Sequence, residues 1–430
     1  MYGDTAWGVG LNEVGIEERS LRSHQAITLG LLFAAGIVNF FDRSSLSVAN
    51  TVVRGELHLN NAQMGWLLSA FSLSYGFAQL GMVGWLDRLG TRRVLGIGLA
   101  VWSLAQLMTG FVHSFAVFLV FRVLLGAGEA PFYPAGIRSM REWFTERTRG
   151  RATALMSSSQ TFGLAAAPPL LTLLMLRIGW RGMFVVLGVV GLVVAVLWLW
   201  LHRQRSDTAY REEVAAPATK NVYGALLTQR TVWGMMLGFA GVNYTAWLYI
   251  SWLPGYLQTE RHLSLSQSGW LAAIPFLAGA MGMLASGVSA DAWVARGFAL
   301  TNIHRMQIVV GMVLSAAASF FASQAYSTTA AVVSISFAFF CIQFGGTSGW
   351  GYVQAVAPSH LVSALGALQN FASFLIASAA PVVTGMIVDE THSFTLAFAV
   401  CAAVTLLGAL SYATLAAPGG MRIEGASSAH

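Results

Sequence analysis

Long apolar stretches, separated by short polar breaks, run along nearly the whole chain. We expect twelve of them to be membrane-spanning helices, because about 20 consecutive apolar residues suffice to cross a bilayer. The breaks are least distinct between Met306 and Val388, a region without Asp, Glu, Lys or Arg. The predicted spans cover residues 26–50, 62–85, 94–112, 115–137, 152–176, 182–202, 231–257, 267–290, 306–324, 329–352, 362–386 and 393–416. The pattern predicts an all-α integral membrane protein.

The spans fall into two sets of six, separated by a charged segment. Two six-helix bundles around a central path are the arrangement that such a division predicts. The expected order is a terminal segment 1–25, a first bundle 26–202, a linker 203–230, a second bundle 231–416 and a tail 417–430.

Basic residues are distributed unevenly between the two sides of the predicted membrane. When both termini are placed on one side, 18 of the 24 Lys and Arg residues fall on that side, four on the other and two within spans. Basic loops remain in the cytoplasm, so both termini are predicted to be cytoplasmic. The net charge of +6 then faces the anionic lipids of the cytoplasmic leaflet, and no nucleic-acid partner is expected.

The composition, with 56% apolar and 10% charged residues, makes the lipid bilayer the main surrounding of the chain. The sequence contains neither a phosphate-binding loop nor zinc-ligand spacing, so we expect no enzyme, no cofactor and no metal. Both cysteines, Cys341 and Cys401, lie within spans, and no disulfide framework is implied.

Four ionisable residues interrupt the predicted spans: Asp42 and Arg43 in 26–50, and Arg122 and Glu129 in 115–137. A charge near the bilayer centre costs about 2.5 to 3.5 kcal/mol on insertion scales, so these residues are expected to pair or to face a wet cavity. Arg122 and Glu129, almost two helical turns apart, share one face about 10 Å apart. Facing helices would allow the pairs Asp42 with Arg122 and Arg43 with Glu129.

These charges have a functional interpretation and a structural one. A carboxylate that moves between a cation, a dry pocket and water changes its proton affinity, which makes Asp42 and Glu129 candidate proton carriers. Protonation of Glu129 would free Arg43 to bind a substrate carboxylate with its forked guanidinium. The alternative is a set of static ion pairs, although buried pairs are a poor source of stability.

Further polar and aromatic residues lie within the spans and are candidates for the substrate pocket. For each of them, hydrogen bonding between helices is an equally good explanation, and it stays open here. The candidates are Tyr75, Gln79, Gln160, Asn243, Tyr244, Trp247 and Asn370.

A short motif recurs at corresponding places in the two halves. The first copy reads Gly84-Trp-Leu-Asp87-Arg88-Leu-Gly90-Thr-Arg92-Arg93, and the second has Gly287 and Asp291 followed by Arg296-Gly297. Each combines a helix-breaking glycine, an acid at a helix end and nearby cations in a cytoplasmic connection. We expect these residues to bridge neighbouring helix ends and to gate a conformational change.

The first copy of this motif resembles the signature of the major facilitator superfamily. Three further segments resemble its anion:cation symporter family: Asn39-Phe-Phe-Asp42-Arg43, Arg122 to Pro134 with Gly126-Ala-Gly128-Glu129-Ala-Pro131, and Trp252-Leu-Pro254-Gly-Tyr256-Leu. The resemblance implies the major facilitator fold, with Asp42 and Glu129 as proton-coupling carboxylates and Arg43 as the substrate anchor. It also implies substrate contacts for Tyr75 and Gln160, and less closely for Asn370.

The sequence therefore predicts a proton-coupled symporter that imports a small organic anion, a sugar acid such as a hexonate, hexarate or hexuronate. An aromatic or dicarboxylic acid is the alternative substrate. An exporter of drugs or organic cations shares the fold, but residues 163–169 lack the Gly-Pro-x-x-Gly-Gly pattern of proton antiporters. A membrane receptor for a sugar acid is the alternative from another class. We expect a monomer in a bacterial inner membrane, with the proton as coupling ion.

Overall fold

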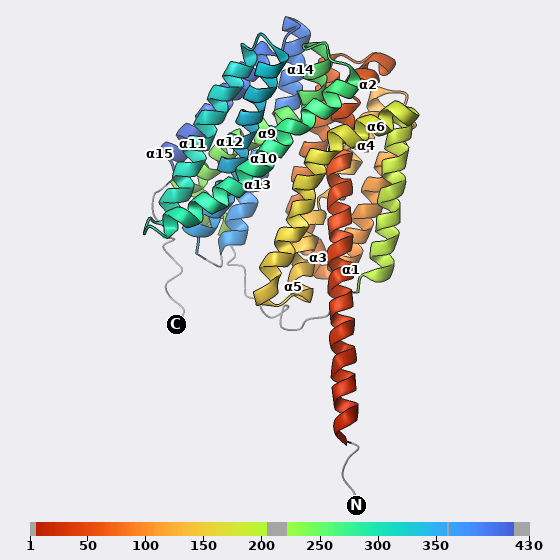
Figure 1. Ribbon diagram of the computed structural model, residues 1–430. Coiled ribbons are helices and arrows are strands. Elements are labelled where there is room, and N and C mark those ends of the chain that lie inside the picture. The colour runs from red at the N-terminus through yellow and green to blue at the C-terminus, as the bar shows by residue number, and fades with distance from the viewer. Residues whose placement is uncertain (1–5, 204–221, 359–360, 417–430) are drawn as a thin grey trace, which may run out of the picture.

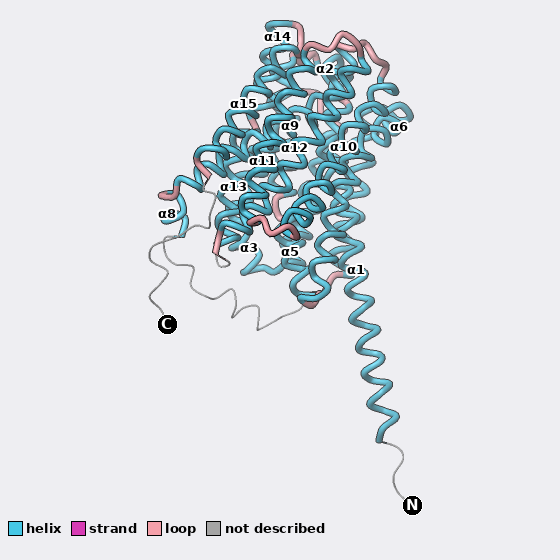
Figure 2. The backbone as a smooth tube through the Cα atoms, turned by 60° about the vertical axis from the view of Figure 1, so that its left-hand side comes forward, coloured by secondary structure: helices cyan, strands magenta, loops and turns pink. Residues whose placement is uncertain are grey.

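The computed structural model describes residues 6–203, 222–358 and 361–416. These residues form helices joined by short connections, and they contain no strand (Figure 1, Figure 2). Most of the predicted linker and the whole predicted tail 417–430 lie outside the described residues.

The first half holds the first six predicted spans. Two long helices each contain two spans and are broken at a glycine in the left-handed region, Gly90 with φ 78° and Gly179 with φ 73°. Only glycine adopts this conformation without strain, so the two breaks are fixed by sequence. The helices are α1 (Ala6–Val48), α2 (Asn50–Leu57), α3 (Asn61–Thr109), α4 (Phe115–Glu129), α5 (Phe132–Trp143) and α6 (Glu146–Leu201).

The second half holds the other six predicted spans. Five of them correspond to one helix each, and the predicted span 362–386 is divided between two helices that meet at Ser378. The helices are α8 (Val222–Leu227), α9 (Arg230–Thr259), α10 (Leu265–Val294), α11 (Leu300–Ser323), α12 (Thr328–Val356), α13 (Val362–Ala377), α14 (Ala379–Thr391) and α15 (Thr395–Thr414).

Helix α1 begins earlier than the pattern of apolar residues indicated. The sequence predicted a membrane span from residue 26, and the helix that contains this span is continuous from Ala6. Figure 1 shows this first part extending away from the bundle. A span pattern detects where apolar residues begin, and a helix that continues into a polar environment gives no such signal.

Two helices at corresponding positions of the halves begin with the same local device. Asn60 accepts a hydrogen bond from the Gln63 amide at 2.7 Å, and the Gln63 side chain accepts one from the Asn60 amide at 3.0 Å. Ser264 and Gln267 form the same reciprocal pair at the start of α10. Such capping boxes satisfy backbone donors that the first helical turn leaves open. The internal repetition of the chain thus extends to helix starts.

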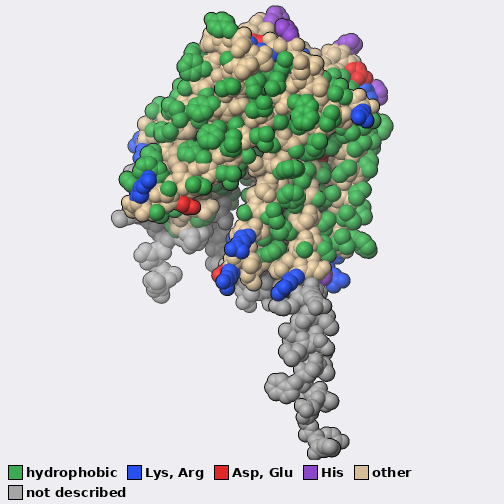
Figure 3. All heavy atoms as spheres, viewed as in Figure 1, with side chains coloured by type: hydrophobic (Ala, Val, Ile, Leu, Met, Phe, Trp, Pro, Cys, Tyr) green, Lys and Arg blue, Asp and Glu red, His purple; other side chains and the backbone are tan. Residues whose placement is uncertain are grey.

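The surface matches a protein embedded in lipid. In Figure 3, apolar side chains cover the flanks of the molecule, and most of the visible basic side chains lie toward its lower end. Eight helical segments in the described part of the chain are long and apolar enough to cross a membrane, one of them the 56-residue α6, and there are nine if the bent α3 counts as one span.

The two halves meet at the end of the molecule where α2 and α14 lie, which is the top of Figure 1 and is called the upper end below. Here Ser47 of α1 donates to the carbonyl of Ser251 in α9 at 2.8 Å, and Thr51 hydrogen-bonds Gln258. Glycines permit this approach: a Cβ atom on Gly65 would lie 2.5 Å from the carbonyl oxygen of Pro381. Toward the lower end the halves diverge (Figure 3).

Candidate functional site

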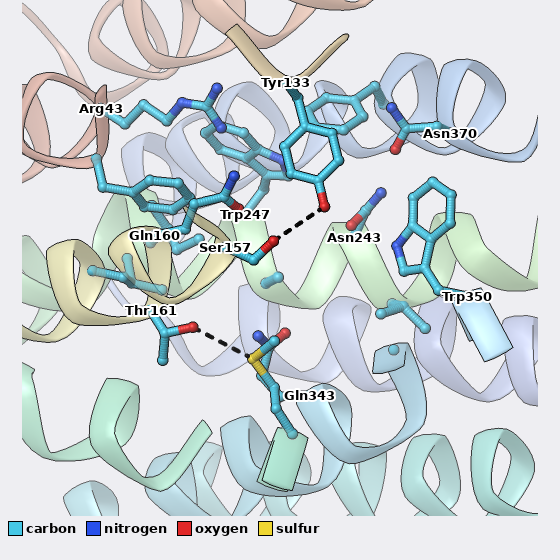
Figure 4. A pocket seen from close by; sticks show the side chains of 18 of the residues that line it. Arg43, Tyr133, Ser157, Gln160, Thr161, Asn243, Trp247, Gln343, Trp350 and Asn370 are labelled. Atoms are coloured by element: carbon cyan, nitrogen blue, oxygen red, sulfur yellow. Dashed lines mark hydrogen bonds between the residues drawn. The ribbon is translucent and has the colours of Figure 1, made fainter. Parts of the chain in front are cut away.

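A cavity of about 410 Å³ lies between the two halves. Its size falls in the range of roughly 300 to 1,000 Å³ that is usual for small-molecule sites. Polar side chains and aromatic rings from both halves line it (Figure 4). The polar and aromatic lining includes Arg43, Tyr75, Gln79, Tyr133, Ser157, Gln160, Thr161, Asn243, Trp247, Gln343, Thr347, Trp350 and Asn370.

Arg43 is the one charged side chain among the described residues that line this cavity. Its Nε donates to Glu129 Oε2 at 2.8 Å, with the two side chains 11% and 0% exposed. Its guanidinium carbon also lies 4.7 Å from the ring centre of Tyr75 and 5.1 Å from that of Phe71. The cation is therefore held by one carboxylate and by aromatic faces while it keeps contact with the cavity.

The predicted pair between Arg43 and Glu129 is confirmed. Glu129 lies at the end of α4, behind Arg43 and outside the cavity lining. Its position two turns beyond Arg122 places both side chains on the face of α4 that is turned into the bundle, as the spacing predicted. The carboxylate thus pairs with the cation that lines the cavity, without lining the cavity itself.

The second expected pair, Asp42 with Arg122, is not formed. Arg122 donates its Nε to the carbonyl oxygen of Leu67 in α3 at 3.1 Å, and its guanidinium lies 5.2 Å from the Phe71 ring. Asp42 is fully buried, and neither of its carboxylate oxygens has a hydrogen-bond partner among the described residues. The sequence allowed this pair if the two helices face one another, but the position of α3 offers Arg122 another acceptor.

Six of the predicted pocket residues besides Arg43 line the cavity: Tyr75, Gln79, Gln160, Asn243, Trp247 and Asn370. Some of their amides also join helices. Asn370 of α13 donates to Gln79 of α3 at 3.0 Å, and Asn243 donates to Ser373 at 2.7 Å. For these residues hydrogen bonding between helices and a position in the cavity wall occur together.

Tyr244 is the exception and corrects the sequence prediction. It is absent from the cavity lining, is 4% exposed and belongs to the apolar core. Consecutive residues of a helix diverge by about 100°, so a residue next to Asn243 points elsewhere. The predicted contact between Tyr244 and a substrate has no geometric support.

Several lining residues were not singled out from the sequence, above all Gln343, Thr347 and Trp350 of α12. One signal for Gln343 was available: it is the one amide side chain in the predicted span 329–352, as Gln160 is in the predicted span 152–176 of the first half. The small and apolar residues around it gave no further indication.

The repeated motif bridges helix ends in the first half, as predicted. Asp87 forms an ion pair with Arg138 of α5 at 2.7 Å, and Arg92 donates to the carbonyl oxygen of Leu199 in α6. The helix-breaking glycine of this copy is Gly90. In the second half, Asp291 is exposed and forms no ion pair with another described residue. Arg88 and Arg93 are exposed.

The fold and this central cavity together define a class of protein. The family model of the Major Facilitator Superfamily matches residues 32–381, and the chain belongs to this family. It is therefore a multi-pass membrane transporter and not an enzyme, as the sequence predicted.

Curated relatives narrow the comparison. The chain is 45% identical over 412 residues to the probable L-galactonate transporter of Escherichia coli (strain K12), covering 93% of this chain and 91% of the relative. It is 32% identical to the probable galactarate/D-glucarate transporter GarP of the same organism, covering 94% of this chain and 96% of that protein. The hexuronate transporter of Bacillus subtilis (strain 168) is 28% identical, covering 88% and 92%.

Solved structures of low identity share the fold. A D-xylose-proton symporter has a TM-score of 0.75 at 14% identity, covering 92% of this chain and 99% of that one. A bacterial homologue of the human lysosomal transporter Spinster has a TM-score of 0.74 at 19% identity, covering 92% and 96%.

Proposed function

We propose that this protein is a proton-coupled symporter that imports a sugar acid across the inner membrane of a bacterium. The observation that carries the proposal is the buried ion pair of Arg43 and Glu129 at the wall of the central cavity. Among the described residues that line this cavity, Arg43 is the one with a charged side chain. The names of the relatives, which are transporters of galactonate, of galactarate and glucarate, and of hexuronates, agree with an anion of this kind.

Arg43 is proposed to anchor the substrate carboxylate. A guanidinium offers two parallel N–H donors that match the two oxygens of a carboxylate. Tyr75 and Trp247 supply apolar faces beside it, and Gln160 and Asn243 supply donors and acceptors for hydroxyl groups. The same set suits a polyhydroxy acid better than a plain aromatic acid, because an arene offers no hydroxyl group to the Gln160 amide.

Glu129 is proposed to couple proton binding to substrate binding. While Glu129 is ionised, it holds the Nε of Arg43 and competes with a substrate anion for this cation. Protonation of Glu129 removes its charge and releases the guanidinium for the substrate. The proton and the anion then enter the site together, and the opposite order of events releases both on the other side.

Asp42 is the second proposed proton carrier. A fully buried carboxylate without a hydrogen-bond donor is costly as an anion, and protonation removes that cost. Arg122 is proposed to act as its charge partner through space, since the two residues form no direct ion pair.

Alternating access is proposed to arise from rocking of the two halves, acting within a monomer. The contacts at the upper end would break as those at the lower end form. The connection from Asp87 to Arg93 would take part, because it already links α3 to α5 and α6 through Arg138 and Leu199.

Uptake of a labelled galactonate into proteoliposomes tests the proposal. We expect accumulation to rise with an inward proton gradient and to fall when a protonophore dissipates it. Accumulation that persists under protonophore would contradict proton coupling, and binding without any transport would identify a receptor. Uptake of an aromatic acid or extrusion of an organic cation in place of sugar-acid uptake would favour one of the alternatives.

A further inference from the structure

The cavity is charged on one side and neutral on the other. Arg43, from α1 of the first half, is the one charged residue of the described lining. Gln343 and Thr347, from α12 of the second half, line the wall that the other half contributes. Figure 4 places Arg43 and Gln343 at opposite sides of the cavity. A ligand long enough to bridge the cavity meets a cation at one end and an amide at the other.

Arg122 does not add a second positive charge to the cavity. The residue is 2% exposed and absent from the lining, and its Nε is engaged by the Leu67 carbonyl oxygen at 3.1 Å. It lies behind Phe71, whose ring is 5.2 Å from its guanidinium carbon. The end of a ligand that lies away from Arg43 therefore meets no charged side chain among the described lining residues.

The neutral wall suits hydroxyl groups and does not suit a carboxylate. Among the described residues, no hydrogen bond engages the side-chain amide of Gln343, and Thr347 donates only to a backbone carbonyl of its own helix. An amide both donates and accepts, as a hydroxyl does, so the two are matched partners. A carboxylate only accepts, and its charge stays uncompensated there once closure excludes water.

We propose that Gln343 and Thr347 make the transporter selective for a polyhydroxy acid with a single carboxylate, such as a hexonate, over the corresponding hexarate. This inference rests on the proposed function and deepens it. A hexonate directs its carboxylate to Arg43 and its terminal hydroxyl to the neutral wall, and its charge balances that of the released cation. A hexarate places a second carboxylate on that wall and leaves one negative charge in the closed cavity.

The wild-type protein tests the inference directly. Proteoliposomes are loaded for counterflow of labelled galactonate, with unlabelled galactonate, galactarate and galactitol as competitors. Galactarate keeps the hydroxyl groups of C2 to C5 and carries a carboxylate in place of the terminal CH2OH group of galactonate, and galactitol has no carboxylate. We expect half-inhibition by galactarate to need a concentration at least about tenfold higher than that of galactonate, since about 1.4 kcal/mol corresponds to this factor. Galactitol should compete least.

Equal or stronger competition by galactarate overturns the selectivity and leaves sugar-acid transport in place. Absence of counterflow with any sugar acid overturns the proposed function instead, so the two failures are distinct.

Variants of the neutral wall test the residues. Gln343→Lys adds a cation opposite Arg43 and should lower the galactarate-to-galactonate ratio of half-inhibitory concentrations by about tenfold. Gln343→Met has similar length without charge and should not lower the ratio. Thr347→Lys is a second route to the same charge if Gln343→Lys melts early. If the lysine variants melt like wild type and the galactarate-to-galactonate ratio is unchanged, Gln343 and Thr347 do not determine the selectivity.

Discussion

At the scale of single residues, the arrangement around Arg43 depends on the shape of the guanidinium as well as on its charge. Nε is used by Glu129 at 2.8 Å, while the planar group packs against the rings of Tyr75, Phe71 and Phe40 at 4.7 to 5.1 Å. A lysine ammonium is a compact, strongly hydrated charge that cannot serve a carboxylate on one edge and stack on rings with its faces.

Arg43→Lys is therefore expected to weaken substrate binding by at least about tenfold, and Arg43→Ala to abolish it. Isothermal titration of purified protein with galactonate measures both effects. The exposed Arg177→Lys is the matched control and should bind as wild type does. Wild-type affinity in Arg43→Lys would remove Arg43 from the role of substrate anchor.

Glu129→Gln imitates the protonated carboxyl permanently. If Glu129 couples the proton to the substrate, the variant should bind and exchange galactonate but should not concentrate it on a proton gradient. If Glu129 is only half of a structural pair, the same change leaves Arg43 without its partner at a poorly solvated place, and a loss of about 3 to 5 kcal/mol of stability is expected.

Thermal melting, counterflow and gradient-driven uptake of the Glu129→Gln variant decide between these interpretations when they are measured on one preparation. Early melting without exchange would favour the structural role. A folded variant that still accumulates substrate on the gradient would show that Glu129 is dispensable for coupling.

At the scale of elements, hydrogen bonds between side chains at helix ends connect the helices at the upper end of the first half. Glu56 of the short α2 accepts hydrogen bonds from the Trp180 indole and from the Arg181 guanidinium, both just after the glycine break of α6. Arg181 also donates to the carbonyl oxygen of Val112 at 3.0 Å. One acid thus connects α2, α6 and the connection between α3 and α4.

This arrangement predicts a dependence of stability on pH. The Trp180 N–H, followed by the Arg181 guanidinium, holds the pKa of the Glu56 carboxyl below its ordinary value. The folded state therefore keeps Glu56 ionised to lower pH than the unfolded state does. Its contribution is complete above the ordinary glutamate pKa of about 4.3 and is lost as the pH falls through the lower folded value.

The difference in melting temperature between wild type and Glu56→Gln should accordingly be constant from about pH 7 to about pH 5 and shrink below about pH 4. The exposed Glu390→Gln provides the matched control. A difference that grows on acidification would contradict the role of Glu56 as an ionised acceptor.

At the scale of the whole molecule, a carboxylate of the second half joins the two halves at the upper end by accepting hydrogen bonds from the start of a helix in the first half. Asp389 of α14 accepts hydrogen bonds from the Asn61 amide at 2.9 Å, the Asn61 side chain at 2.7 Å and the Ala62 amide at 2.7 Å. These donors begin α3 of the other half, where the helix dipole also favours a negative charge. Any state that opens the upper end must break all three bonds.

Asp389→Asn keeps the size of the side chain but removes its charge. It also replaces one acceptor oxygen by an NH2 group, which would face the N–H donors of Asn61 and Ala62. With a loss of about 1 to 2 kcal/mol, the population open at the upper end should rise about five- to thirtyfold. Spin labels on Arg177→Cys and Tyr326→Cys, one exposed site in each half, report the opening as longer distances. Both native cysteines are buried. Glu390→Gln, next in the chain, should leave the distances unchanged, and an equal shift in both variants would contradict a specific role of Asp389.

The sequence by itself determined which segments lie in the membrane and where many helices begin and end. All twelve predicted spans lie on helices, because apolar length is a local property that needs no partner. Gly90 and Gly179 end spans through their own conformational freedom, and Asn60 with Gln63 starts one through bonds within a single turn. The buried charges were visible for the same reason, since their cost depends on the span that contains them.

Tertiary structure alone decided which side chains meet. Arg122 and Asp42 lie on the expected helices, yet α3 brings the Leu67 carbonyl within reach of Arg122 and leaves Asp42 without a hydrogen bond. Asn243 lines the cavity and Tyr244 does not. Gln343 also lines it, although the sequence of its span did not indicate a position in the cavity wall. Helix periodicity fixes the angle between neighbouring residues, but the direction of the cavity is set by how twelve spans pack, which no single span encodes.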